Sequence, residues 1–111
     1  MSLLPNYNQA IIPIEKFTEY ALNPNKDPNK ADAFESALGY NLRNAAVLIE
    51  NIRRNLSQFP AVAKDNKGYG MTYEIIMQLT GINGKTAKVK TGWIHDDVND
   101  EVRLVTAFVD K

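Results

Sequence analysis

The chain has no cysteine, a single histidine and no net charge, since 13 basic residues balance 13 acidic ones. The lack of cysteine excludes a disulfide framework, a thiolate metal site and a cysteine nucleophile. A cytoplasmic protein fits this lack, and so does a secreted effector whose fold needs no disulfides. Because there is no net charge, any attraction to nucleic acid must come from a local patch.

Metal-binding, phosphate-binding and membrane patterns are also missing. One histidine and scattered carboxylates do not form the ligand set of a zinc or two-metal site. The acidic run 96–100 lacks the glycine and the terminal glutamate of a helix-flanked calcium loop, and we interpret it as a turn. There is no Gly-rich phosphate loop and no apolar run of membrane-spanning length. We therefore expect no metal, no cofactor and no membrane partner.

What is present is typical of one globular domain spanning 1–111, with 44% apolar and 23% charged residues. Apolar residues repeat at helical spacing in the part from about 13 to 57, which predicts helices at 13–22, 28–38 and 42–57. The apolar stripe of the longest predicted helix consists of Leu42, Ala45, Ile49, Ile52 and Leu56.

Strand patterns fill the part from about 61 to 109, with a first strand starting near Ala61. The last strand, from Glu101 to Val109, is apolar on both faces in its second half, which is typical of a central or covered strand. Helices followed by antiparallel strands predict an α+β fold. We expect three helices on one face of an antiparallel meander sheet of three to four strands.

The clearest local pattern is a hairpin over 71–95, with Asn83-Gly84 in its turn. A two-residue loop would place the apolar side chains of one strand beside the polar side chains of the other. A three-residue loop instead pairs Leu79 with Ala87, and in the same register Met77 with Val89 and Tyr73 with Trp93. A one-residue slip exchanges the two faces, so the buried face favours the three-residue loop, closed by Gly84 at positive φ.

The opposite face of this hairpin is the candidate site. It presents Glu74 beside Lys88 and Lys90, and Arg103 joins them if Leu104 and Phe108 both face the core. Such a face can hold a phosphodiester, with Glu74 as the base and Arg103 or a lysine stabilising the developing charge. The alternative is that alternating charges only solvate an exposed sheet face.

His95 is the only histidine and the natural candidate for proton transfer near neutral pH. The alternative, which we favour on the pattern, is a histidine at the end of a strand that is hydrogen-bonded into the following turn.

Two stretches resemble a small uncharacterised domain of bacterial and phage proteins, which is found in toxin-like C-terminal regions. They are 29–40 (NKADAFESALGY) and 83–94 (NGKTAKVKTGWI), the second of which is followed by 103–107 (RLVTA). That domain in turn looks like the helices-then-sheet ribonucleases grouped with barnase, colicin nucleases and RelE-type toxins. The resemblance covers the chain from about Ile12 to the C-terminus.

The resemblance points to Lys30, Trp93, Arg103 and Thr106 as positions of the family pattern. The family often has a histidine shortly before the lysine, whereas this chain has Asp27-Pro28-Asn29 there. A catalytic histidine at that place is therefore not carried over. Lys30 also fits an exposed first-turn residue, and Trp93 fits the core.

Two functions remain as alternatives. The first is a metal-independent, RNase-like or toxin-type domain that acts on RNA. Its catalytic candidates are Glu74, His95 and Arg103, and its binding candidates are Lys30, Lys88, Lys90 and Thr106. The second is a non-catalytic protein-interaction module of a bacterial or phage system, whose partner would be an immunity protein or another protein.

Overall fold

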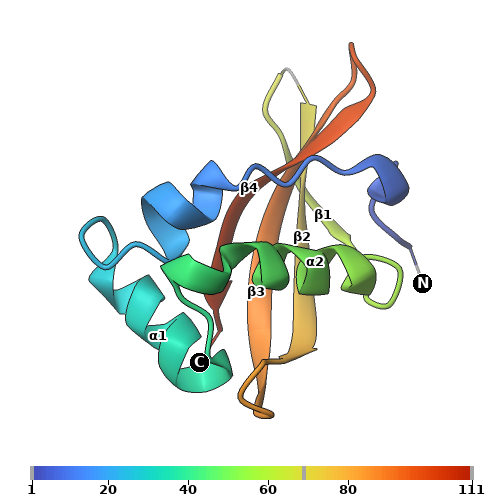
Figure 1. The fold of residues 1–111 in the computed structure, drawn as a ribbon. Helices are drawn as coiled ribbons and strands as arrows, with labels where there is room; N and C mark the ends of the chain where they lie inside the picture. Colours follow the sequence, from blue (N-terminus) through green and yellow to red (C-terminus); the bar gives the residue numbers. More distant parts are fainter. Residues whose placement is uncertain (1, 69, 111) are drawn as a thin grey trace.

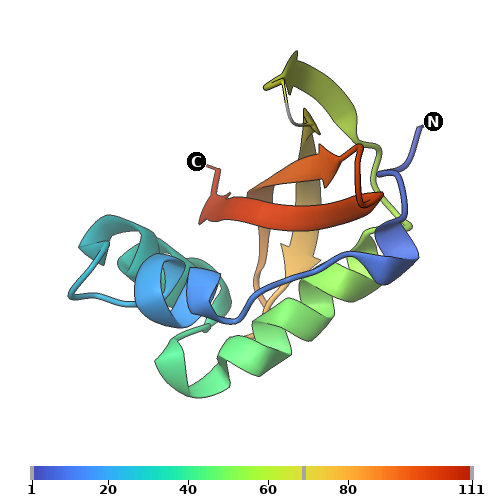
Figure 2. The same ribbon diagram turned by 90° about the horizontal axis from the view of Figure 1, so that it is seen from above.

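The computed structural model describes residues 2–68 and 70–110. A four-stranded antiparallel sheet with the strand order β1-β2-β3-β4 forms one layer, and the helices form a second layer on one of its faces (Figures 1 and 2). The α+β architecture with a meander sheet is therefore confirmed. The strands are β1 (Val62–Asn66), β2 (Gly70–Thr80), β3 (Thr86–Asp96) and β4 (Glu101–Val109).

Helix α1 (Pro28–Leu38) has the predicted bounds, and local chemistry explains both ends. The Asp27 side chain accepts a hydrogen bond from the Lys30 backbone N–H at 3.1 Å, and Pro28 occupies the first helical turn. At the other end Gly39 has φ +81°, the left-handed conformation that stops a helix.

The other two predicted helices are shorter than expected. A π-helical turn, η2 (Phe17–Ala21), replaces the helix predicted at 13–22, and the chain also makes a 3₁₀ turn, η1 (Tyr7–Gln9). The helix predicted at 42–57 divides into a 3₁₀ turn, η3 (Leu42–Asn44), and helix α2 (Ala45–Asn55).

The division of this helix changes which side chains face the core. Leu42 is exposed, so the predicted stripe was wrong there. Ile49 is half-buried and packs against the core, while the fully buried Leu48 was not in the predicted stripe. A 3₁₀ turn has three residues per turn rather than 3.6, so the first turn does not continue the apolar stripe of the α-helix that follows.

The hairpin of β2 and β3 has the predicted register. Tyr73 pairs with Trp93, Met77 with Val89 and Leu79 with Ala87. The Gly81 N–H donates to the Lys85 carbonyl at 2.8 Å, which leaves a three-residue loop, and Gly84 has φ +81°. Matching the buried faces was thus sufficient to select the register.

Strand β4 contains a β-bulge that the sequence did not reveal. Thr106 pairs with Gly92 but Leu104 pairs with Trp93, so Val105 is the extra residue. The bulge reverses the alternation of side chains along β4. Leu104 faces the core as expected, whereas Phe108 lies opposite Lys90 on the other face, and the expectation that both face the core was wrong.

β4 is an edge strand rather than a central one, but other parts of the chain cover its outer edge. The Leu104 N–H donates to the Ile11 carbonyl at 2.9 Å, in a short parallel bridge with the N-terminal segment, and α1 packs against the same strand.

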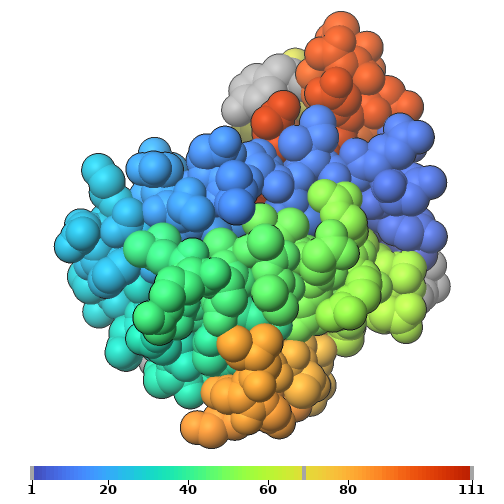
Figure 3. Space-filling model, in the orientation of Figure 1, coloured from blue at the N-terminus to red at the C-terminus, as the bar shows by residue number. Residues whose placement is uncertain are grey.

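The core lies between the helices and the sheet, and its polar groups are satisfied. Trp93 is 1% exposed, and its Nε1 donates to the buried Thr91 Oγ1 at 2.8 Å, which itself donates to the Ile75 carbonyl at 3.0 Å. Figure 3 shows the helical layer covering the near face, with the β2–β3 loop and the β3–β4 turn projecting beyond it. The opposite face of the sheet has no helical layer (Figure 2).

Candidate site on the open sheet face

We call the sheet face opposite the helices the open face. The strand pairing brings its side chains into rows across the sheet, one of which runs from Glu74 through Gly92 to Thr106. The open-face residues that matter for the site are Glu74, Ile76, Lys88, Lys90, Gly92, Arg103, Thr106 and Phe108.

Glu74 lies between two lysines. Its Oε2 atom is 3.6 Å from the Nζ atom of Lys90, and its Oε1 atom is 3.8 Å from the Nζ atom of Lys64. The Glu74 side chain keeps 26% of its surface exposed, so a ligand can reach the carboxylate. Sequence reasoning missed Lys64, because its place depends on how the irregular strand β1 pairs with β2.

Gly92 leaves a gap in the side chains of β3 in the middle of the open face. A Cβ atom added to it would lie 2.9 Å from the Cγ2 atom of Thr106, so the Thr106 side chain leans over this glycine. The row therefore has a carboxylate on β2, no side chain on β3 and a hydroxyl on β4.

Lys30 reaches the same region from the first turn of α1. Its Nζ atom is 3.4 Å from the Thr106 Oγ1 atom and 3.8 Å from an Asp27 carboxylate oxygen. The Nζ atoms of Lys30 and Lys90 lie 5.5 Å and 5.8 Å from the centre of the Phe108 ring. The structure thus brings together three predicted binding residues, Lys30, Lys90 and Thr106. They meet around Phe108, which sequence reasoning had assigned to the core.

Arg103 and Lys88 share the open face but lie farther along it. Arg103 pairs with Ile94, in the row next to that of Glu74, and lines a cavity of about 310 Å³ that extends to the β3–β4 turn. Lys88 pairs with Gln78 toward the β2–β3 loop and is exposed. Among the described residues, neither cation has a carboxylate within ion-pair distance.

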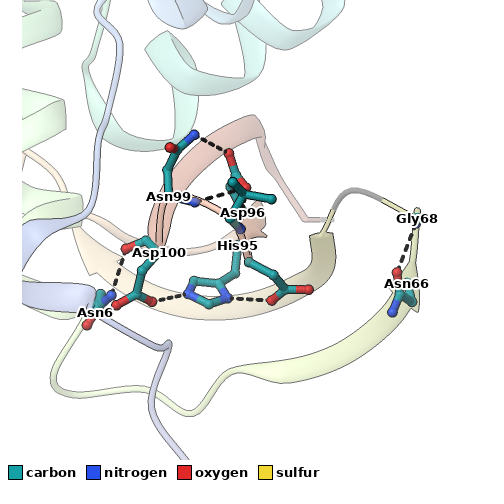
Figure 4. A network of polar contacts seen from close by, with 9 residues as sticks. Asn6, Asn66, Gly68, His95, Asp96, Asn99 and Asp100 are labelled. Atoms are coloured by element: carbon teal, nitrogen blue, oxygen red, sulfur yellow. Dashed lines mark hydrogen bonds and ion pairs between the residues drawn. The ribbon is translucent and has the colours of Figure 1, made fainter.

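His95 is not part of this cluster. It pairs with Met71 and Val102, which places it on the core side at the far end of β3. Its Nε2 atom is 2.8 Å from an Asp100 carboxylate oxygen, and its Nδ1 atom is 3.4 Å from one of Asp97 (Figure 4). This is the strand-end histidine bonded into a turn that the sequence favoured, and the fold separates it from Glu74.

The turn around His95 holds two carboxylates in their charged form. The side-chain amide of Asn6 and the His95 ring lower the pKa of the Asp100 carboxyl. The Asn6 Nδ2 atom also donates to the Asp100 carbonyl at 2.8 Å. Hydrogen bonds from the Asn99 side chain and the Val98 N–H lower the pKa of Asp96. The Asn6 contact joins the N-terminal segment to the turn, whereas the contacts of Asp96 lie within the turn.

Neither a metal site nor a membrane-spanning helix is found in the part of the chain that the structure describes. Within 2–68 and 70–110, no group of three or more histidine, cysteine, aspartate or glutamate side chains is placed to bind a metal ion. In the same residues, no helix has both the length and the apolar character needed to cross a membrane.

Comparison with known proteins places the chain in a family without assigning it an activity. Neither the curated proteins nor the solved structures contain a match to it. Residues 3–111 match the family described as a domain of unknown function (DUF6883), and the chain belongs to that family.

Proposed function

We propose that this domain is a metal-independent, RNase-like enzyme that acts on RNA at the open face. The observation that carries the proposal is the Glu74 carboxylate, held between Lys64 and Lys90 in the same row as Gly92. A carboxylate can accept a proton, while ammonium groups bind phosphate oxygens and stabilise the negative charge that develops on them. The resemblance to ribonucleases with helices followed by a sheet supports the same assignment.

RNA supplies its own nucleophile, so the reaction needs few groups from the protein. Glu74 takes the proton of the ribose 2′-hydroxyl as the 2′-oxygen bonds to phosphorus. The bond from phosphorus to the 5′-oxygen breaks, and this oxygen takes a proton from water. The products are a 2′,3′-cyclic phosphate and a 5′-hydroxyl. Lys30, Lys90 and Arg103 bind the phosphate oxygens, and Glu74 returns its proton to the solvent.

The test is incubation of the purified protein with RNA in the presence of EDTA, comparing wild type with Glu74→Gln. We expect wild type to cut RNA and the variant to bind RNA without cutting it, because a general base acts in the transition state. Glu50→Gln, at an exposed position on α2, is the matched control and should cut like wild type. Equal cleavage by Glu74→Gln and wild type would remove Glu74 from the mechanism.

A protein-interaction module is the second candidate function. It is favoured by Val62 and Ile76, which are 54% and 43% exposed on the same open face as the lysines. Apolar side chains beside cations suit an acidic protein partner, such as an immunity protein. Failure of wild type to bind or cut RNA, together with a stable complex with an acidic partner protein, would favour this function.

A further inference from the structure

A small cavity adjoins the open face at the β4 edge of the sheet. Its volume is about 190 Å³, and it lies between η2, the first turn of α1 and the β4 bulge. The side chains that line it include Tyr20 from η2, Lys16 just before η2, Lys30 from α1, and Val105 and Thr106 from β4. The Asp27 carboxylate also lines the cavity, 3.8 Å from the Lys30 Nζ atom, so Lys16 is the cation there with no carboxylate within ion-pair distance among the described residues. We call this cavity the edge pocket.

We propose that the edge pocket binds one nucleotide of an RNA strand, next to the nucleotide held at Glu74. Its base packs on the Tyr20 ring, and its phosphate lies between Lys16 and Lys30. This inference rests on the proposed function, because it extends the path of the same RNA strand.

A chain of contacts connects the edge pocket with Glu74. Lys30 lines the pocket, and its Nζ atom is 5.5 Å from the centre of the Phe108 ring. Lys90 lies 5.8 Å from the same ring and 3.6 Å from Glu74. Two cations therefore mark a path from the carboxylate to the pocket, and a strand with regularly spaced phosphates can follow it.

Tyr20 provides the surface for a base. It is 59% exposed although its neighbours Phe17 and Ala21 on η2 are buried, so the core does not require this ring. The Lys16 Nζ atom is 6.0 Å from the ring centre. Proteins that bind single-stranded RNA commonly use an exposed aromatic ring with a nearby cation, on which a base stacks while the cation binds the backbone.

The β4 bulge shapes one wall of the pocket. Ile11 covers the outer edge of β4 at Leu104, because the Ile11 carbonyl accepts a hydrogen bond from the Leu104 N–H. Beyond the bulge the Asp110 N–H donates to the Lys88 carbonyl, so the backbone groups of Asp110 point toward β3. Backbone groups alternate in direction along a strand, so the N–H and C=O of Ala107, three residues earlier, point away from β3. Ala107 lines the edge pocket but is only 3% exposed, so it forms part of the pocket wall rather than a surface that a base can pair with.

The size of the pocket limits the ligand. At about 190 Å³ it is smaller than the roughly 300–1,000 Å³ of pockets that enclose drug-sized ligands. It therefore suits one nucleotide unit of a longer strand, with the rest of the strand lying on the open face. The alternative is that Lys16 and Tyr20 are only neighbouring surface residues on one helical turn.

The experiment measures binding of fluorescein-labelled single-stranded RNA hexanucleotides, oligouridylate and oligoadenylate, by fluorescence anisotropy at low salt. The protein carries Glu74→Gln so that the probe stays intact. We expect Tyr20→Ala to weaken binding about tenfold, the loss of one stacked base, and Tyr20→Phe to bind like its parent. Lys16→Ala should also weaken binding, whereas Lys26→Ala, at an exposed position outside the pocket, should not.

The outcomes separate the two proposals. If the Glu74→Gln protein binds RNA and Tyr20→Ala in the same background binds it equally well, the proposal of a nucleotide in the edge pocket is overturned. The proposal of RNA binding at the open face is then unaffected. If the Glu74→Gln protein binds neither hexanucleotide, the RNA function fails and the pocket fails with it. Tyr20 is exposed, and Tyr20→Phe keeps the ring. Weak RNA binding by Tyr20→Ala together with full binding by Tyr20→Phe therefore supports stacking rather than misfolding.

Discussion

Gly92 on β3 and Thr106 on β4 fit against each other so closely that a methyl group on Gly92 would lie 2.9 Å from the Thr106 Cγ2 atom. Thr106 in turn lies 3.4 Å from the Lys30 ammonium. Gly92 thus leaves room for the Thr106 side chain, which meets Lys30 from α1.

The first prediction concerns this fit. Gly92→Ala should destabilise the protein by about 1 kcal/mol, at the low end of the cost of an extra methyl group in a packed site, because both residues are half-buried; urea unfolding measures the loss. Thr106→Ser removes the Cγ2 atom and keeps the hydroxyl, so Gly92→Ala should cost much less in a Thr106→Ser background. An equal cost in both backgrounds would mean that the two residues are not coupled.

The β-sheet was more predictable than the positions of its cationic side chains. The hairpin register followed from matching apolar faces around Asn83-Gly84, because a slip of one residue would expose the whole face. The bulge at Val105 could not be found in this way, since Leu104, Val105 and Phe108 are all apolar and the alternation shows no break. Phe108 was therefore assigned to the wrong face.

The candidate site was predictable in its members and not in its arrangement. Glu74 and Lys90 followed from the hairpin register alone. The contact between Lys30 and Thr106 spans 76 positions and depends on how α1 packs against β4, which no local pattern records. Lys64 depends on the irregular pairing of β1 with β2 in the same way.

The second prediction concerns the β2–β3 loop. Gly84→Val should destabilise the protein by about 1–2 kcal/mol, because φ +81° is strained for a β-branched residue. No atom lies within 4 Å of the place of the new Cβ, so backbone strain rather than a clash accounts for the loss. Gly84→Asn tests this cause, since asparagine tolerates positive φ and should cost less. Thermal unfolding of both variants measures the difference.

The third prediction compares two neighbours on α2. Leu48 is fully buried, and Leu48→Ala should cost about 2–5 kcal/mol through lost transfer energy and a cavity. Ile49 is only half-buried, so Ile49→Ala should cost clearly less. Urea unfolding of both variants measures the two losses in the free energy of unfolding and shows which is larger. A larger loss for Ile49→Ala would mean that α2 is rotated relative to the sheet.

The fourth prediction concerns pH. Asn6 and His95 lower the pKa of Asp100 from its ordinary 3.8. A lowered carboxyl pKa adds stability that is present above the ordinary pKa and is lost as pH falls through the lower pKa of the folded state. Asp100→Asn removes this contribution, and asparagine tolerates the φ of +54° at this position.

Wild type should therefore unfold at a higher temperature than Asp100→Asn at about pH 6, and the gap should shrink as the pH falls below about 4. Melting curves of both proteins across this range, followed by circular dichroism, give the measurement. A gap that stays constant down to about pH 2 would show that the charge of Asp100 does not stabilise the fold.

The last prediction concerns RNA binding at the open face. Lys88→Glu with Lys90→Glu should weaken binding strongly at low salt and flatten its salt dependence. Each lysine that contacts a phosphate contributes about 0.7 to the slope of log K against log salt concentration for a single strand. The measurement is fluorescence anisotropy with a labelled oligonucleotide over a range of salt concentrations.

Lys26→Glu with Arg54→Glu is the matched control, because it changes the net charge by the same amount at exposed positions off the open face. If the control keeps the wild-type slope while the open-face variant loses it, phosphates contact the open face itself. Equal losses in both variants would show that only the overall charge matters. In that case Lys88 and Lys90 would serve to solvate the sheet, and the exposed Ile76 beside them would point to a protein partner.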